Sequence, residues 1–161
     1  MKFMDKMKEI YQNNKNIKIY LDMDGTIVEC LFDKDDSYKK EGAYLKKEPI
    51  IPVMDQIEKI NNTLKNVEIN ILSCSRDKKM SKEKNEWIDK NIPYIKKNNR
   101  IFLEKKDPTE DRNKVKGEYI KKHILQDEVA ILIDDDRNVL KEAQKIVGES
   151  IIPIHVTSLI I

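Results

Sequence analysis

The 161-residue sequence has few cysteines, few histidines and no long apolar run, and each shortage excludes a class of protein. The two cysteines, Cys30 and Cys74, are not spaced as a metal-binding pair, so we expect reduced thiols in a cytoplasmic protein. Charged residues at positions 5, 6, 8 and 9 interrupt the start, and no signal peptide is expected. Apolar runs stay well below the roughly 20 residues that a membrane span needs. We therefore expect no membrane association.

A strong charge of one sign is also lacking. The 31 lysines and arginines oppose 29 acidic residues, which gives a formal net charge of +2. Lysines alternate with acids, for example along residues 78–90, and this pattern predicts solvated helix faces rather than a clustered basic surface. The charge therefore gives no indication of nucleic-acid binding, although it leaves that possibility open, and the oligomeric state is not set by the sequence.

Short apolar segments alternate with amphipathic ones along the chain. The spacing predicts helices at 3–11, 53–64, 80–92, 117–125 and 139–147, and strands at 17–22, 67–72, 100–103, 129–133 and 151–156. Strands that alternate with helices indicate right-handed βαβ units. We expect an α/β fold, a three-layer α/β sandwich with a Rossmann-like parallel sheet. The length predicts one domain over 1–161, with a small cap or flap insertion at about 27–51.

The segment Asp22-Met23-Asp24-Gly25-Thr26 begins at the last residue of the first predicted strand. Two carboxylates brought together in this way repel each other, so they call for a cation, a shared proton or phosphate chemistry. Side chains two residues apart in an extended segment share a face, so both carboxylates can reach one group. The alternative is an Asp-Gly turn that merely closes the strand.

Polar side chains also end two other predicted strands. Ser73 and Ser75 follow the second strand, and Asp134, Asp135 and Asp136 follow the fourth. Parallel strands end at one edge of a sheet, so a carboxylate cluster with a hydroxyl beside it is expected there. Oxygen ligands without a Cys/His set favour Mg²⁺ over zinc.

Each of these residues has a simpler interpretation when it is taken alone. Ser73 could simply terminate a strand, and the three aspartates could simply cap the next helix. Lys116 could be an ordinary surface lysine. Lys114 and Lys116 precede the helix that leads into the fourth strand, where a basic residue would balance the acidic charge. The order and spacing of all the parts together is a much rarer coincidence than any single part.

This set of motifs resembles the haloacid dehalogenase superfamily of phosphohydrolases over about residues 17–156. The segments that carry the resemblance are 21–26 for the first motif, 71–73 for the second, Lys116 for the third and 131–135 for the fourth. Within that superfamily, residues 131–140 and Lys116-Gly117-Glu118-Tyr119 are most similar to the small 5'(3')-deoxyribonucleotidases.

The resemblance implies a phosphomonoester hydrolase that works through an aspartyl-phosphate, on a nucleotide or another small phosphorylated metabolite. Asp22 would be the nucleophile and Asp24 the proton carrier. Asp22, Asp134 and the backbone carbonyl of Asp24 would hold Mg²⁺.

The resemblance also implies roles for the remaining polar residues. Ser73 and Lys116 would bind the transferring oxygens, with Lys114 and Lys105 as other candidates for the lysine and Ser75 as a further hydroxyl. Asp135 would orient Lys116 or metal-bound water. Asp136 would cap the following helix.

Other functions stay open at this point. A phosphatase or phosphotransferase acting on nucleic-acid ends, a sugar phosphate or a protein would have the same site, and loops 27–51 and 104–112 would select among them. Phe32, Tyr38 and Tyr44 would either stack on a base or form the core of the cap. A receiver-like module is disfavoured because its acid pair would precede its acceptor aspartate. A phosphate-binding pseudoenzyme is disfavoured by the intact set of acids.

Overall fold

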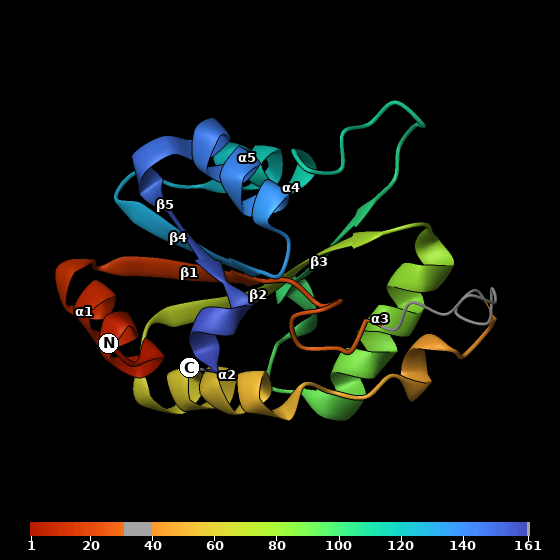
Figure 1. Ribbon diagram of the computed structural model, residues 1–161, viewed down its shortest axis with the longest axis horizontal. Helices are drawn as coiled ribbons and strands as arrows, with labels where there is room; N and C mark the ends of the chain where they lie inside the picture. The colour runs from red at the N-terminus through yellow and green to blue at the C-terminus, as the bar shows by residue number, and fades with distance from the viewer. Residues whose placement is uncertain (31–39, 161) are drawn as a thin grey trace.

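Five parallel strands form the single sheet of the computed structural model, which describes residues 1–30 and 40–160. The spatial order is β3-β2-β1-β4-β5, so β1 lies at the centre and β3 and β5 at the edges (Figure 1). The strands are β1 Asn16–Leu21, β2 Val67–Ser75, β3 Arg100–Glu104, β4 Glu128–Asp134 and β5 Ile151–His155. The predicted parallel sheet is confirmed.

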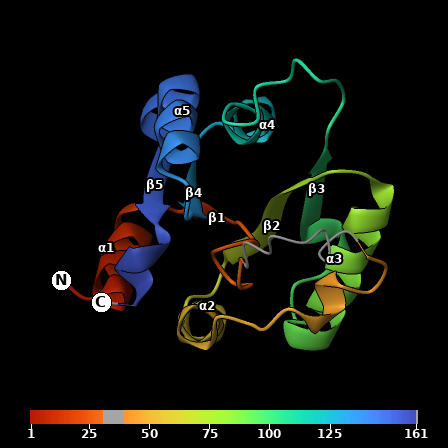
Figure 2. The ribbon, with the colours of Figure 1, turned by 45° about the vertical axis from the view of Figure 1, so that its right-hand side comes forward.

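Helices cover both faces of the sheet. The α-helices are α1 Phe3–Asn13, α2 Ile51–Thr63, α3 Lys78–Asn91, α4 Val115–His123 and α5 Arg137–Val147. Helices α1, α2 and α3 lie on one face and α4 and α5 on the other (Figures 1 and 2). Short 3₁₀ helices span Tyr44–Lys46, Lys97–Asn99, Gly148–Ser150 and Val156–Leu159. This arrangement is the expected three-layer α/β sandwich.

The alternation of side chains along the central strands builds two separate cores. In β1, Ile19 and Leu21 pack with α1, α2 and α3, whereas Tyr20 packs toward α4 and α5. In β4, Ile131 joins the first core and Leu132 the second. A strand with apolar residues on both faces is buried between two helix layers, which explains why these strands are continuous apolar runs in the sequence.

The described part of the predicted insertion folds back toward its own start. Val28 forms an antiparallel bridge with Pro49, and the backbone N–H of Ile50 donates to the carbonyl of Ile27 at 2.8 Å. Residues 31–39, with the predicted base-stacking candidates Phe32 and Tyr38, lie outside the described residues.

Two element boundaries differ from the prediction in ways that affect the site. Strand β2 continues through Ser75 because Ser73, Cys74 and Ser75 pair with β3, so Ser73 lies inside the strand. Helix α4 begins at Val115, so Lys116 lies in its first turn and not before it.

Among the described residues, no helix has the length and apolar character that crossing a bilayer requires.

Candidate active site

The pairing of β1 with β4 brings two of the predicted carboxylates to the same edge of the sheet. Leu21 is in register with Ile133, and the N–H of Asp22 donates to the carbonyl of Ile133 at 3.0 Å. The side chains of Asp22 and Asp134 are both buried. Asp134 is the last residue of β4, in register with His155 of β5, and Asp22 follows β1, so both carboxylates lie at the carboxyl edge of the sheet, where ligands of parallel α/β sheets bind.

Lys116 joins these two carboxylates. Its Nζ atom lies 2.6 Å from Asp22 Oδ1 and 2.6 Å from Asp134 Oδ2, and the residue is 4% exposed. Burial acts to lower the pKa of Lys116, but the two carboxylates raise it above its ordinary value. Of the other lysines considered from the sequence, Lys114 and Lys105 are exposed. Lys116 is therefore the candidate that the fold places in the carboxylate cluster.

A group of three carboxylates has the character of a divalent-cation site. Asp22, Asp134 and Asp135 each offer an oxygen atom, and these atoms lie within 4.8 Å of one another. Burial, followed by the charges of Asp22 and Asp134, raises the pKa of Asp135 to about 7. A hard cation would relieve this repulsion, and an oxygen-only donor set suits Mg²⁺. The described residues therefore fit the metal that the sequence predicts.

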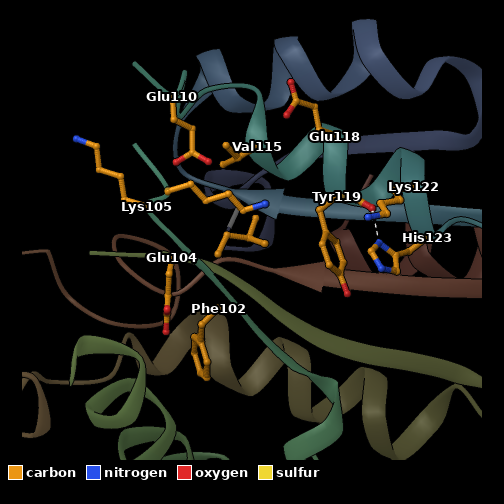
Figure 3. Close-up of a pocket in the computed structure, with 11 residues that line it drawn as sticks. Phe102, Glu104, Lys105, Glu110, Val115, Glu118, Tyr119, Lys122 and His123 are labelled. Carbon is orange, nitrogen blue, oxygen red and sulfur yellow. Dashed lines mark hydrogen bonds between the residues drawn. The ribbon is translucent and has the colours of Figure 1, made fainter. Parts of the chain in front are cut away.

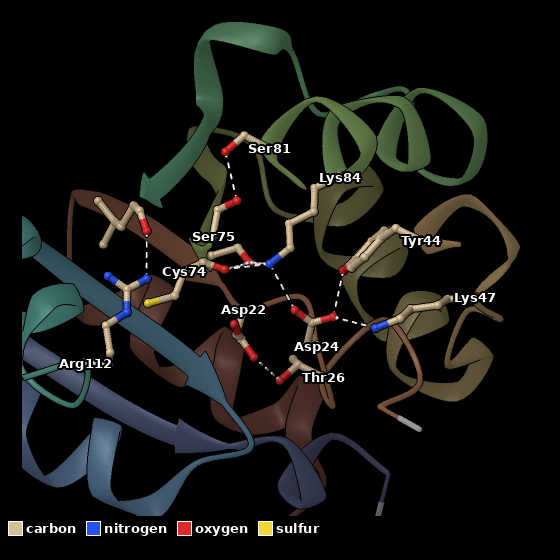
Figure 4. A network of polar contacts seen from close by, with 12 residues as sticks. Asp22, Asp24, Thr26, Tyr44, Lys47, Cys74, Ser75, Ser81, Lys84 and Arg112 are labelled. Atoms are coloured by element: carbon tan, nitrogen blue, oxygen red, sulfur yellow. Dashed lines mark hydrogen bonds and ion pairs between the residues drawn. The ribbon is translucent and has the colours of Figure 1, made fainter. Parts of the chain in front are cut away.

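Asp24 belongs to a second cluster of polar groups, next to the first (Figure 4). Tyr44 Oη donates to Asp24 Oδ1 at 2.9 Å, and Lys47 Nζ lies 3.4 Å from the same oxygen. Lys84 Nζ lies 2.9 Å from the other oxygen, Oδ2. Although burial acts to raise it, Lys84 and Lys47 hold the pKa of Asp24 below its ordinary value. The side chain of Asp24 thus contacts two lysines and a tyrosine, not the cluster formed by Asp22, Asp134 and Asp135.

Lys84 is the site residue that sequence reasoning missed. The lysines of residues 78–90 were expected on solvated faces, but Lys84 is 2% exposed, and for this residue the expectation is wrong. Its neighbours one helical turn away, Met80, Trp87 and Ile88, pack into or against the core. A lysine within an apolar stripe at helical spacing was the signal that could have identified it.

The serines of β2 differ in their contacts. Ser73 Oγ lies 2.8 Å from Lys84 Nζ, which places this hydroxyl beside the group that contacts Asp24. Ser75 Oγ instead donates to the carbonyl of Asp77 at 3.1 Å and accepts from Ser81 Oγ at 2.9 Å. Ser73 therefore lies within the polar network of the site, whereas the described contacts of Ser75 lie at the start of α3.

The turn after β1 holds the acids in place. Thr26 Oγ1 lies 3.2 Å from Asp22 Oδ2 and is positioned to donate to it. Gly25 has φ +79°, and a Cβ atom there would lie 2.2 Å from Asp135 Oδ2. Glycine at position 25 is thus needed both for the turn and for the close approach of Asp135.

Asp136 accepts hydrogen bonds from the N–H groups of Asn138 and Val139, which confirms that it caps α5.

A separate hollow of about 650 Å³ lies between β3 and α4 (Figure 3). Lys105 lines it at the carboxyl end of β3, and Tyr119 and His123 line the opposite end, with their rings stacked 4.0 Å apart. Lys116 is absent from its lining residues, although its neighbour Val115 is among them. The hollow therefore backs onto the helix that carries Lys116 and is distinct from the carboxylate cluster.

The arrangement as a whole separates two carboxylates that are two residues apart. Asp22 faces Lys116 and the acids of β4, whereas Asp24 faces Lys84, Tyr44 and Lys47. Asp22 therefore lies among carboxylates that could hold a cation, whereas the surroundings of Asp24 favour its ionised form.

Comparisons with known proteins show the fold alone. No protein-family model matches the chain. No curated protein matches it either. One similar solved structure is that of the Pnkp1/Rnl/Hen1 RNA repair complex, with a TM-score of 0.61 and 15% sequence identity. The match covers 87% of this chain and 42% of the other, so this chain spans less than half the length of that neighbour.

Proposed function

We propose that the chain is a magnesium-dependent phosphomonoester hydrolase that acts through an aspartyl-phosphate on Asp22, with a nucleotide or another small phosphorylated metabolite as substrate. The observation that carries this proposal is the division of the two acids. Asp22 shares the ammonium group of Lys116 with Asp134, while Asp24 is held by Lys84 and Tyr44. Two acids with separate partners can take separate roles, one as nucleophile and the other as proton carrier.

The two acids would act in sequence. Asp24 must first take up a proton, because Lys84 and Lys47 favour its ionised form. A carboxylate oxygen of Asp22 then attacks phosphorus, the bond from phosphorus to the leaving oxygen breaks, and Asp24 gives that proton to the leaving oxygen. Water then attacks phosphorus, passes a proton to Asp24, and the bond between phosphorus and Asp22 breaks. The products are the alcohol and inorganic phosphate, and both acids return to their starting state.

The remaining groups would bind the phosphoryl oxygens. Lys116 contacts Asp22, and the Ser73 hydroxyl shares Lys84 with Asp24, so each could donate to oxygens that gain charge in the transition state. Asp22, Asp134 and the backbone carbonyl of Asp24 would hold Mg²⁺, with the Asp135 carboxylate close by. When bound, the ion would neutralise charge on the phosphoryl group.

A phosphorylated nucleic-acid end is a second candidate substrate. The structural neighbour is named as an RNA repair complex, and it shares the fold of this chain. The net charge of +2 gives no independent support for a polyanionic substrate. We therefore place this substrate after the small metabolites.

Hydrolysis of an aryl phosphate with Mg²⁺ tests the proposal. We expect turnover by the wild type, loss of at least 100-fold in Asp22→Asn (about 3 kcal/mol), and wild-type rates in Asp55→Asn, which changes an exposed acid of α2. Equal rates in Asp22→Asn and the wild type would contradict the proposal. A panel of nucleoside monophosphates, sugar phosphates and 3'- or 5'-phosphorylated oligonucleotides then ranks the substrates.

A further inference from the structure

The ammonium group of Lys84 has three hydrogen-bond acceptors, which equals the number of its N–H donors. They are Asp24 Oδ2 at 2.9 Å, Ser73 Oγ at 2.8 Å and the carbonyl of Cys74 at 2.6 Å. A buried ammonium group is costly unless it is fully paired, so this geometry accounts for a lysine that is 2% exposed.

The partners of Lys84 come from two strand ends that the sequence links to phosphate chemistry. Asp24 follows β1, and Ser73 lies near the end of β2. Lys84 reaches both from α3, and it is the one residue among the described contacts that bonds to both of them. A lysine that only filled space in the core would not need to join these two groups.

Both oxygens of Asp24 are fixed from different sides. Lys84 holds Oδ2, and Tyr44 holds Oδ1 at 2.9 Å. The side chain of Asp24 still keeps 34% of its surface exposed, so the carboxyl group is oriented but open to a ligand. Rotation of this carboxyl group would break at least one of the two contacts.

Helix α3 also holds the segment that carries Tyr44. Trp87 Nε1 donates to the carbonyl of Lys47 at 3.0 Å, and the N–H of Gly42 donates to Glu83. Glu83, Lys84 and Trp87 therefore fix both Asp24 and the segment next to it from one stretch of helix.

We propose that Lys84 is a positioning residue that holds the Asp24 carboxyl group and the Ser73 hydroxyl on either side of the transferring phosphoryl group. This inference rests on the proposed function. Lys84 would orient the Asp24 carboxyl group for proton transfer. It would also hold the Ser73 hydroxyl at a fixed position relative to that carboxyl group. The role adds to that of Lys116, which contacts Asp22 and Asp134.

Kinetics with two substrates tests the role in proton transfer. Nitrophenyl phosphate has a good leaving group that needs little protonation, and an alkyl phosphate has a poor one that depends on Asp24. We expect Lys84→Met to lower kcat at least ten times more for the alkyl ester than for the nitrophenyl ester, and Lys84→Arg to recover part of the loss. Lys82→Met, on an exposed position of the same helix, should behave as the wild type. Equal losses on both esters would overturn the inference.

A double-mutant cycle tests the contact without any need for activity. We expect the Tm decreases of Lys84→Met and Asp24→Asn to sum to more than the decrease in the double variant, because each single change already breaks the same contact. Additive Tm changes would overturn the inference. A wild type that hydrolyses neither ester would refute the proposed function instead, and the cycle would still decide whether Lys84 positions Asp24.

Discussion

The indole N–H of Trp87 donates to the backbone carbonyl of Lys47, 3.0 Å away. This bond joins the centre of α3 to the chain just after the 3₁₀ helix Tyr44–Lys46. The Trp87 side chain is fully buried, so the bond is shielded from water. Tyr44, which contacts Asp24, therefore depends on α3 for its position.

Replacing Trp87 by phenylalanine should loosen this segment. The change removes the donor, leaves the carbonyl of Lys47 without it, and leaves a small cavity, so we expect the free energy of unfolding to fall by about 2 kcal/mol. Circular dichroism during urea denaturation measures this change. Hydrogen exchange should also become faster at Lys46 and Lys47, whose N–H groups donate within this turn. Unchanged exchange there would show that Trp87 does not hold the segment.

Lys116→Met should make the protein dependent on a divalent cation for its stability. The variant leaves Asp22 and Asp134 buried together without their ammonium partner, which costs about 3–5 kcal/mol for a buried pair. We expect a lower Tm in EDTA and a larger rise in Tm on addition of Mg²⁺ than in the wild type. Differential scanning fluorimetry measures both.

Lys114→Met is the matched control for that experiment, because Lys114 is exposed and lies two residues earlier. Its Tm should match that of the wild type with and without Mg²⁺. A Lys116→Met protein as stable in EDTA as the wild type would argue against the contacts of Lys116 with both acids.

Gly25→Ala should destabilise the protein more than Gly148→Ala. Both glycines have positive φ, +79° and +84°, so each substitution carries a backbone cost of about 1 kcal/mol. A Cβ atom at Gly25 would also collide with the carboxylate of Asp135, whereas the space around Gly148 is open. We expect weaker Mg²⁺ binding by isothermal titration in Gly25→Ala alone. Equal behaviour of the two variants would show that Asp135 can move away without consequence.

Tyr94→Phe tests a hydroxyl group that makes none of the contacts of the candidate site. Within the described residues the Tyr94 hydroxyl has no hydrogen-bond partner, so its removal should leave stability unchanged or raise it by about 1 kcal/mol. Burial, followed by the charge of Glu58, raises the pKa of Tyr94 to about 12. A raised pKa gives the wild type a stability contribution that is present below the unfolded value of about 10 and is lost as pH rises toward 12. The variant should therefore lose less stability than the wild type between pH 10 and 12, as measured by urea denaturation.

The sheet and most of the carboxylates could be predicted because local patterns encode them. Apolar runs in β1 and β4 end in acids, and parallel strands bring their ends together whatever the details of packing. The sequence could not show which lysine of several enters the cluster, because this depends on where α4 begins. It also could not separate the surroundings of Asp24 from those of Asp22, since Tyr44 and Lys84 reach Asp24 through tertiary packing alone.

Lys84 illustrates the general difficulty most clearly. Its helix is highly charged, and the average behaviour of lysine in such a helix is solvation. Lys84 is buried because it meets the acceptors Asp24, Ser73 and Cys74. These acceptors belong to other elements of the fold, so the sequence of the helix does not reveal them.

The central place of β1 has a consequence for the order in which the protein folds. Asp22 meets Lys116 across 94 residues of sequence, and Asp24 meets Lys84 across 60. Contacts between such distant positions carry a large loop-closure entropy and form slowly. The repelling carboxylates are therefore assembled only after β4 has docked beside β1. Recovery of the proposed Mg²⁺ binding during refolding would thus report the docking of β4 beside β1.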